Sequence, residues 1–565
     1  MTEKIGTSSF EKIFISGWRP YFWIAAAIIL LYLKSLDFGF TYLDDNVLIV
    51  NNSHFLRDLS NMGHAFFQKV FIKGYLPYYR PMLVVSLVLD AQFGGTSAFM
   101  YHLTNIIIHA GASCLVFVLL TRLGYERGPS FLFSAIFAVH PALSQGVAWI
   151  PGRNDTLLAV FILASFIFFL DLLRKGRPAC YLWHLCFFVL ALFTKETALV
   201  LIPVCVFYLH FIAKEKIFSL NEKALALGWL VGAYIWFLFR QVAVQGSAEM
   251  SLYDMLSLMI TYAPAALQFI GKVFFPFNLS VFPIIMDTSF IYGFAAMAAL
   301  VAALVFTKKR RYNYILFGIL WAVLFVAPSL IRANTWLVAD FLEHRVYVPV
   351  IGIIVILSET DLVRNFASKR RILVPAALLI IAVFSAITFF HIDNFRDRFA
   401  FWTNAVRTTP HSSFSHLAMA GAYHDNGLLD KAAAEYENCL ALDPQKPDAL
   451  FGLGDIYLKK GMFDKAEKEF KKAIAVYPAY DNAYVELGVL YYRRGRLKEA
   501  ERAWNRALEF NPNNVVAYKN LAIYYQEQKD LVRAAYCAKR LQEMDIKVPA
   551  DFLKSVGIKQ ERQGE

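Results

Sequence analysis

Long apolar runs separated by short polar segments fill the first two thirds of the chain. Each run approaches the length that a helix needs to cross about 30 Å of hydrocarbon. We therefore predict eleven membrane-spanning helices, near residues 21–36, 101–120, 131–149, 156–173, 180–193, 197–213, 224–239, 290–307, 314–331, 346–358 and 372–391. After residue 391 the sequence becomes charged and rich in alanine and tyrosine. This change predicts two domains, 1–391 in the membrane and 392–565 outside it.

Two further apolar segments do not fit the pattern of spans. Residues 255–275 are long enough to cross, but a crossing there would move the next basic loop to the other side of the membrane. We expect a re-entrant or interfacial segment instead. Residues 82–90 are too short to cross, and we expect an amphipathic helix that lies on the outer membrane face.

Basic residues gather in short loops between the apolar runs. With the N-terminal run read as a retained helix that starts in the cytoplasm, four basic loops face the cytoplasm. These loops are "RKGR" at 174–177, "KEK" at 214–216, "KKRR" at 308–311 and "SKRR" at 368–371. They account for much of the net charge of +12, so we expect no nucleic-acid partner. The composition, 58% hydrophobic with a mean hydropathy of +0.46, likewise favours a polytopic membrane protein.

Beyond residue 400 the sequence repeats itself with a period of 34 residues, which is typical of tetratricopeptide repeats. The residues that recur in phase are Pro410, Pro444, Pro478 and Pro512, together with Gly427, Gly461 and Gly495. We predict four repeats, at about 413–446, 447–480, 481–514 and 515–546. The last is degraded, with Lys529 at the glycine position, as in a capping repeat.

A solenoid of this kind presents a groove in which we expect a protein or peptide acceptor to bind. The alternative is that the repeats only dock on the membrane domain or mediate oligomers.

Polar residues collect at the predicted outer ends of the spans. "YLDDN" places two adjacent carboxylates, Asp44 and Asp45, just after the first span. Ionisable residues beside or inside spans are costly, which makes them candidates for function. The other outer segments rich in such residues are 78–81, 140–157, 193–199 and 332–349.

The chemistry of these residues is complementary. Five basic side chains can neutralise a phosphate: Arg80, Arg153, Lys195, His344 and Arg345. The paired acids can act as a general base for a hydroxyl nucleophile. They can also bind Mg²⁺ or Mn²⁺, in a site with only two protein ligands. Supporting polar residues are His140, Asp155, Glu196 and Glu343. The combination predicts sugar transfer from a polyprenyl phosphate to an acceptor hydroxyl.

Simpler explanations exist for each motif. Adjacent acids in a loop are usually solvated, and "EHR" at 343–345 or "TKE" at 194–196 can be an internal ion pair. Arg153, close to Asp155, can cap a helix. For the whole chain, the alternatives are a lipid-linked glycan polymerase or ligase, a transporter, and a non-enzymatic membrane scaffold that presents the repeats.

The motifs resemble, in content and order, those of the transmembrane-and-tetratricopeptide O-mannosyltransferases and their bacterial relatives. The resemblance runs from about residue 37 to 546 and rests on "YLDDN", residues 78–110, residues 140–157, "TKETALVLIP" and "EHRVYVP". It implies an all-α fold, with a GT-C glycosyltransferase domain followed by the solenoid. The catalytic loop would be 37–80 on the outer face, and one of Asp44 and Asp45 would be the base.

The resemblance also implies the donor, the acceptor and the membrane. The donor would be a polyprenyl-phosphate-linked sugar, with mannose as one candidate, and the acceptor a protein hydroxyl. In a bacterium the chain would lie in the inner membrane with its repeats in the periplasm. In a eukaryote it would lie in the membrane of the endoplasmic reticulum.

Overall fold

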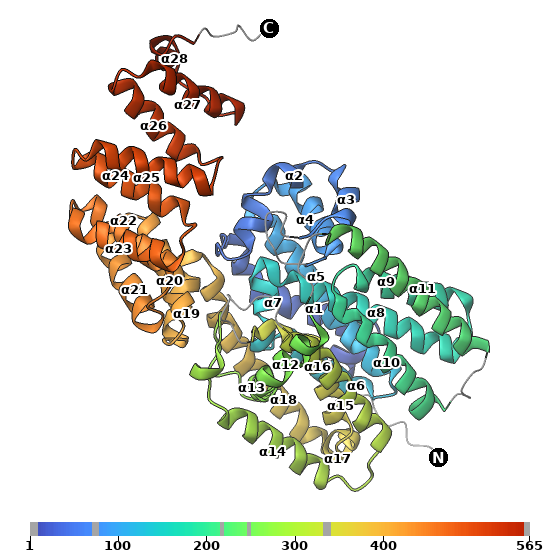
Figure 1. Cartoon of the computed structure of the whole chain (residues 1–565). Helices are drawn as coiled ribbons and strands as arrows, with labels where there is room; N and C mark the ends of the chain where they lie inside the picture. The colour runs from blue at the N-terminus through green and yellow to red at the C-terminus, as the bar shows by residue number, and fades with distance from the viewer. Residues whose placement is uncertain (1–9, 71–77, 215–219, 246–249, 332–340, 559–565) are drawn as a thin grey trace, which may run out of the picture. The chain divides into compact units, whose positions relative to one another are not determined.

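The computed structural model describes residues 10–70, 78–214, 220–245, 250–331 and 341–558. All regular elements in these ranges are helices, so the predicted all-α class is confirmed (Figure 1). The chain divides into two compact units, Met1–Pro410 and His411–Glu565. The predicted boundary after residue 391 falls earlier than this division. Helix α19 (Arg398–Thr408) belongs to the first unit, where its Asn404 Oδ1 accepts a hydrogen bond from the Val281 amide at 3.1 Å.

The first unit holds the apolar helices, and the chain is a multi-pass membrane protein. Within the ranges that the structure describes, seven helical segments are long and apolar enough to cross a membrane. They are Arg19–Asp37, Ala98–Arg122, Ile150–Lys175, Glu196–Ala213, Glu222–Ala243, Tyr312–Leu330 and Phe366–Phe395. Two bent helix pairs raise the number to nine if each pair is a single span.

The lengths of the helices support the eleven predicted spans unequally. All eleven predicted segments are helical, but three form the shorter helices α9 (Pro178–Leu192), α14 (Ile291–Val305) and α16 (Pro349–Ser358). At 1.5 Å per residue, 15 residues reach less than the thickness of the hydrocarbon layer. Whether these three helices cross the membrane therefore stays a prediction.

Helices α12 (Leu252–Tyr262) and α13 (Pro264–Phe274) form one of the bent pairs, with an angle of 48° between them. Pro264 lies at the bend, where its ring prevents one continuous helix. A broken span and a re-entrant loop both have this geometry, so the re-entrant segment that we expect at 255–275 remains a prediction.

The prediction for residues 82–90 is wrong. They lie in helix α4 (Pro81–Gly94), which is buried on most of its surface and has no separate polar face. Its one acidic side chain, Asp90, is itself buried. Helix α4 is therefore an interior element rather than an amphipathic helix on the membrane surface.

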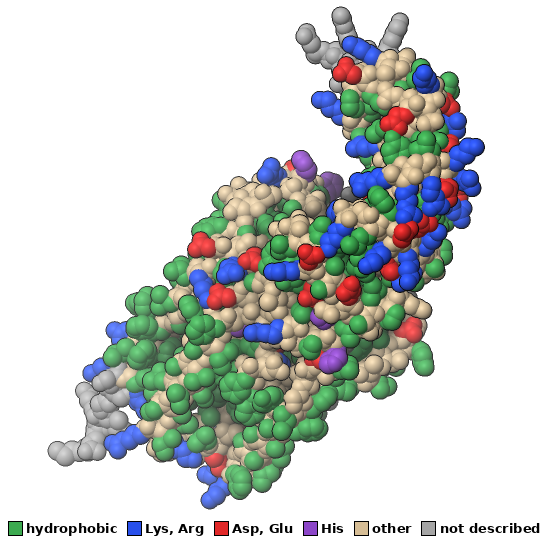
Figure 2. Space-filling view, turned by 90° about the vertical axis from the view of Figure 1, so that its left-hand side faces the viewer, with side chains coloured by type: hydrophobic (Ala, Val, Ile, Leu, Met, Phe, Trp, Pro, Cys, Tyr) green, Lys and Arg blue, Asp and Glu red, His purple; other side chains and the backbone are tan. Residues whose placement is uncertain are grey.

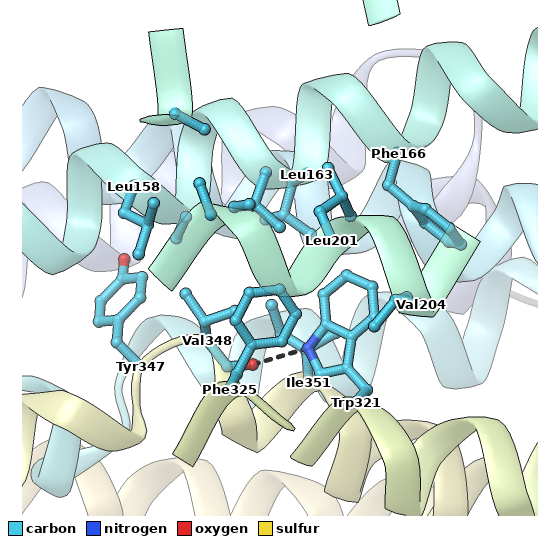
Figure 3. Packing of buried hydrophobic residues seen from close by; sticks show 14 of the residues in the cluster. Leu158, Leu163, Phe166, Leu201, Val204, Trp321, Phe325, Tyr347, Val348 and Ile351 are labelled. Atoms are coloured by element: carbon cyan, nitrogen blue, oxygen red, sulfur yellow. Dashed lines mark hydrogen bonds between the residues drawn. The ribbon is translucent and has the colours of Figure 1, made fainter. Parts of the chain in front are cut away.

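The core of the first unit joins helices that are distant in sequence (Figure 3). Helix α8 (Arg153–Lys175) and helix α10 (Leu201–Phe207) pack against α15 (Tyr312–Val326) and α16. Between them the indole of Trp321 lies 5.4 Å from the Phe166 ring and donates a hydrogen bond to the Val348 carbonyl at 3.0 Å. This packing fixes the segment just before α16, which carries part of the candidate site.

The second unit consists of four helix pairs and a short final helix, α28 (Ala550–Ser555). The pairs are α20 (Ser413–Asp425) with α21 (Leu429–Leu442), α22 (Pro447–Lys459) with α23 (Phe463–Val476), α24 (Asp481–Arg493) with α25 (Leu497–Phe510), and α26 (Val515–Glu527) with α27 (Leu531–Glu543). Each pair lies within one predicted repeat, and the tetratricopeptide solenoid is confirmed. Figure 2 shows that this unit is rich in charged side chains, whereas hydrophobic side chains cover much of the first unit.

The periodic residues of the repeats have structural roles. Gly427, Gly461 and Gly495 adopt φ between +72° and +73° in the turn within each pair, a conformation that costs glycine little. The repeated glycine inside α22 permits close helix contact, because a Cβ at Gly454 would lie 2.7 Å from the Phe470 ring. In the degraded fourth repeat Lys529 adopts φ +61° in place of glycine.

Candidate active site

The acidic loop lies between η2 (Leu33–Asp37) and η3 (Asn46–Val50). The Asp45 carboxylate is 1% exposed and accepts hydrogen bonds from the amides of Thr41, at 2.6 Å, and Leu43, at 3.1 Å. The Thr41 hydroxyl also donates to it at 3.1 Å. The loop turns tightly here, since Tyr42 has φ +57°. Asp45 therefore holds the loop in shape.

Asp44 has a different environment from its neighbour. Its side chain is partly exposed and has no hydrogen-bond or ion-pair partner among the residues that the structure describes. Burial and the charge of the adjacent Asp45 raise the pKa of the Asp44 carboxyl, the charge of Arg80 lowers it, and the net result is a pKa of about 6. Asp44 is thus ionised at neutral pH yet basic enough to accept a proton.

A second cluster of charged residues consists of Asp155, Lys195 and His344, which come from three separate segments. Asp155, in the first turn of α8, accepts from Lys195 Nζ at 2.7 Å and lies 3.4 Å from His344 Nε2. Lys195 precedes η7 (Glu196–Val200), and His344 belongs to η11 (Glu343–Val346). Burial lowers the pKa of His344 to about 3, so its imidazole is neutral. Burial also lowers the pKa of Lys195, while Asp155 opposes that shift.

Arg80 and Arg345 add positive charge next to this group. Both guanidinium groups act electrostatically on Lys195 and His344, and Arg80 also acts on Asp44. Arg80 lies 4.6 Å from the Tyr78 ring, and its buried Nε has no hydrogen-bond partner in the described part of the chain. Arg345 donates to the Ser329 carbonyl at 2.7 Å. Arg80 thus has donor capacity available for an anion.

Trp149 links the acidic loop to this group, although the sequence did not point to it individually. Its indole Nε1 donates to Thr41 Oγ1 at 3.2 Å, and its ring lies 5.5 Å from the His344 ring. Gln145, one turn earlier, accepts from the His344 amide at 3.2 Å. Both residues fall in the predicted outer segment 140–157, but neither is ionisable, so a search for charge missed them.

Arg153 lies outside the group. It is fully buried, and its guanidinium is satisfied by Asp90 at 2.6 Å, Asn105 Oδ1 at 2.6 Å and the Tyr101 carbonyl at 2.7 Å. The expected neighbour Asp155 is not its partner. Arg153 therefore joins α4 and α5 (Ala98–Arg122) to α8, and these contacts leave little capacity for a lipid phosphate.

The remaining predicted residues also have other contacts. Glu343 pairs with Lys272 at 3.3 Å and accepts from the Ser280 amide at 2.8 Å, and burial raises its pKa. His140 bonds the Val273 carbonyl at 2.9 Å and so fixes α13. Glu196 is exposed, beside buried Lys195. Glu343 and His140 therefore support neighbouring elements, and none of the three residues joins Asp44.

The repeat region is similar to a known family of domains. The family model described as "Cilia and flagella-associated protein 70 middle TPR-like domain" matches residues 416–545. Human "Protein O-mannosyl-transferase TMTC1" is 22% identical over 507 residues, which cover 77% of this chain and 56% of the human protein. The curated relatives of this chain are TMTC O-mannosyl-transferases. The resemblance predicted from the motifs is therefore confirmed.

Other TMTC relatives match shorter stretches. Drosophila melanogaster Tmtc1 is 29% identical over 184 residues, 32% of this chain and 21% of the fly protein. The Caenorhabditis elegans protein O-mannosyl-transferase F38B6.6 is 24% identical over 382 residues, 65% of this chain and 54% of the worm protein. The matched regions thus span between 21% and 56% of the length of these three relatives.

Among solved structures, the chain resembles small repeat proteins. MamA is 22% identical with a TM-score of 0.24, covering 26% of this chain and 86% of MamA. YrrB, "a TPR protein with an unusual peptide-binding site", is 24% identical with a TM-score of 0.25, covering 28% of this chain and 80% of YrrB. At such scores the likeness supports no statement about function.

A metal site has limited support from the donor groups at the acidic loop. No group of three or more His, Cys, Asp and Glu side chains that could hold a metal ion occurs within the described ranges. Asp45 already accepts from two amides and a hydroxyl, which leaves Asp44 as the freer oxygen donor. A hard divalent cation prefers six or more oxygen ligands, so substrate and water would have to supply most of them.

Proposed function

We propose that this protein is an integral-membrane glycosyltransferase of the GT-C type. It moves a sugar from a polyprenyl-phosphate donor to an acceptor hydroxyl, on a protein, at the outer face of the membrane. The main support for the proposal is the environment of Asp44. Its carboxylate is half-buried, has a raised pKa, lies close to Arg80 and has no partner among the described residues. The relatives, named protein O-mannosyl-transferases, support mannose as the sugar and a protein as the acceptor.

Asp44 is the proposed general base. Its carboxylate takes the proton of the acceptor hydroxyl as the hydroxyl oxygen attacks the anomeric carbon. The new carbon–oxygen bond forms while the bond from that carbon to the lipid phosphate breaks, which inverts the configuration. Asp45 is the positioning residue, because its hydrogen bonds to Thr41 and Leu43 fix the loop that presents Asp44.

Arg80, Lys195 and Arg345 are the proposed contacts of the donor phosphate. As the phosphate leaves it gains negative charge, and preorganised cations in a buried site stabilise that charge strongly. Asp155 holds Lys195 in place at 2.7 Å. His344 lies 3.4 Å from Asp155 and helps to orient it. Because its imidazole is neutral, it adds no positive charge to the site. We assign Arg153, which is committed to Asp90, a structural role.

The repeat unit would supply the acceptor. We infer that its groove binds a protein or peptide, and that the repeats lie on the outer side of the membrane, as Asp44 does. In a bacterial cell the carrier would be undecaprenyl phosphate and that side the periplasm, and in a eukaryotic cell dolichyl phosphate and the lumen of the endoplasmic reticulum.

Transfer assays with the full chain in lipid nanodiscs test this function. Radiolabelled mannose is offered either as polyprenyl-phosphate mannose or as a nucleotide sugar, with a peptide acceptor and a matched peptide whose Ser and Thr are replaced by Ala. We expect label in the hydroxyl peptide from the lipid donor only. Equal transfer from the nucleotide sugar, or no transfer from any polyprenyl-phosphate sugar, would contradict the proposal.

A further inference from the structure

A cavity of about 470 Å³ lies at the end of the first unit away from the acids. Its walls are mostly apolar and come from α6 (Arg127–Ala138), α14, the end of α16, α17 (Asp361–Arg364) and α18 (Phe366–His391). Helix α16 separates the cavity from the proposed phosphate contacts. It starts at Pro349, just after the segment with His344 and Arg345, and reaches the cavity only at Leu357. The cavity is therefore distinct from the proposed donor site.

The cavity opens among apolar side chains that are exposed on the surface. Two residues of its wall, Phe306 and Ile380, are 81% and 41% exposed. The apolar window of α18 is only 11% buried inside the protein, so most of that helix is available to hydrocarbon. Figure 1 shows α14 and α17, which both contribute to the cavity wall, at the lower edge of the unit. A flexible hydrocarbon chain could enter from the bilayer without crossing water.

One end of the cavity is polar and positively charged. Lys369 lies in its wall, and among the described residues its ammonium has no hydrogen bond or ion pair. Lys308 and Lys309 follow directly after Thr307 of the wall and are exposed. The one acid among the wall residues, Asp361, accepts hydrogen bonds from the backbone amides of Lys308, at 2.7 Å, and Lys309. These bonds lower its pKa, and the charges of Arg364 and Lys369 lower it further. Lys369 thus lies in the wall near a carboxylate that is already engaged, and the exposed Lys308 and Lys309 are next to the wall in sequence.

We propose that this cavity binds an anionic membrane phospholipid, with one acyl chain among the apolar side chains and the phosphate against Lys369, Lys308 and Lys309. The volume lies within the range of about 300–1,000 Å³ that is usual for ligand sites. Basic pockets between membrane helices are suited to anionic lipid headgroups. The inference does not depend on the proposed glycosyl transfer, because the site is remote from Asp44 and needs no sugar donor.

Lipid retention can be measured on the full chain by native mass spectrometry after extraction from nanodiscs. We would compare nanodiscs of phosphatidylglycerol with nanodiscs of phosphatidylcholine, which has the same chains but no net charge. We expect phosphatidylglycerol to stay bound and phosphatidylcholine to be lost. Lys369→Gln should weaken retention about fivefold, since each basic residue near a lipid surface contributes on the order of that factor.

Two variants complete the test. Ala377→Trp places a bulky side chain in the cavity wall and should also lower retention, whereas Lys223→Gln removes an exposed lysine at the start of α11 (Leu220–Ala243) and should leave it unchanged. Unfolding temperatures check that each variant is folded. Equal retention of the two lipids, or no effect of Lys369→Gln, would overturn the proposal. Displacement of the bound lipid by polyprenyl phosphate would assign the cavity to another occupant.

Discussion

Asp44 and Asp45 are the same residue type at adjacent positions, yet their surroundings separate their roles. Asp45 is buried and accepts hydrogen bonds from two amides and a hydroxyl. Asp44 is partly exposed, and beside Arg80 it keeps its oxygens available. The sequence predicts the pair but cannot say which acid is which, because the difference arises from how the loop folds around Thr41.

Stability should distinguish the two acids. Asp45→Ala leaves the buried amides of Thr41 and Leu43 without an acceptor, and we expect it to destabilise the fold by about 1–3 kcal/mol. Asp44→Ala should leave the unfolding temperature at neutral pH unchanged or slightly higher, because the raised pKa means that the ionised form is disfavoured in the folded state. Thermal unfolding in nanodiscs measures both. The reverse order would contradict the assignment.

The pH dependence of transfer follows from the pKa of Asp44. A general base works only when it is deprotonated, and this carboxyl titrates at about pH 6. The rate should fall tenfold per pH unit below this value and level off above it. Initial rates between about pH 4.5 and about pH 8 test the expectation. If the transfer rate falls only near pH 4, where an ordinary carboxyl group titrates, Asp44 is not the base.

At the scale of elements, periodic patterns gave correct predictions. The 34-residue period identified the repeats, and the same packing recurs at that spacing: a Cβ on Gly454 would meet the Phe470 ring, and a Cβ on Gly488 would meet the Trp504 ring. The apolar runs likewise gave helices at all eleven positions. Whether all eleven cross the membrane stays a prediction, because α9, α14 and α16 are shorter than the hydrocarbon layer is thick.

Pairings between distant elements could not be predicted. Nothing in the segment 82–90 shows that Asp90 would meet Arg153, 63 residues later, and thereby bury helix α4. The same limit holds for Asp155 with Lys195 and His344, since three separate loops form that group. Sequence reasoning found the charged residues of the site but neither their partners nor Trp149.

The contact between α15 and α16 should be sensitive to one methyl group. A Cβ on Gly318 would lie 2.7 Å from the Gly352 carbonyl oxygen, and a Cβ on Gly352 would lie 2.7 Å from the Ala322 amide. We expect Gly352→Ala to cost about 1–3 kcal/mol, as overpacking usually does. The control is Gly111→Ala, where a Cβ meets nothing within 4 Å. Equal unfolding temperatures for the two variants would contradict this packing.

At the scale of the whole molecule, the two ends of the first unit differ in their chemistry. The acids and the phosphate contacts lie at one end, and the lysine-rich cavity lies at the other. The orientation that we predict places the basic loops in the cytoplasm and Asp44 on the outer side.

Cysteine labelling tests the orientation directly. Tyr42→Cys, on the exposed residue beside the acids, should react with a membrane-impermeant maleimide in intact cells or sealed vesicles of known orientation. Lys309→Cys should react only after the membrane is opened. The parent for both is a variant in which the exposed Cys186 is replaced by Ser. Labelling of both sites from the same side would refute the orientation.

The central claim is that Asp44 is the base of a membrane sugar transfer. The most direct measurement is the rate of mannose transfer from polyprenyl-phosphate mannose by wild type, Asp44→Asn and Glu196→Gln, which removes an exposed carboxylate near Lys195. We predict a loss of about 10²–10⁴ for Asp44→Asn and little change for Glu196→Gln. An active wild type with an equally active, folded Asp44→Asn would contradict the account.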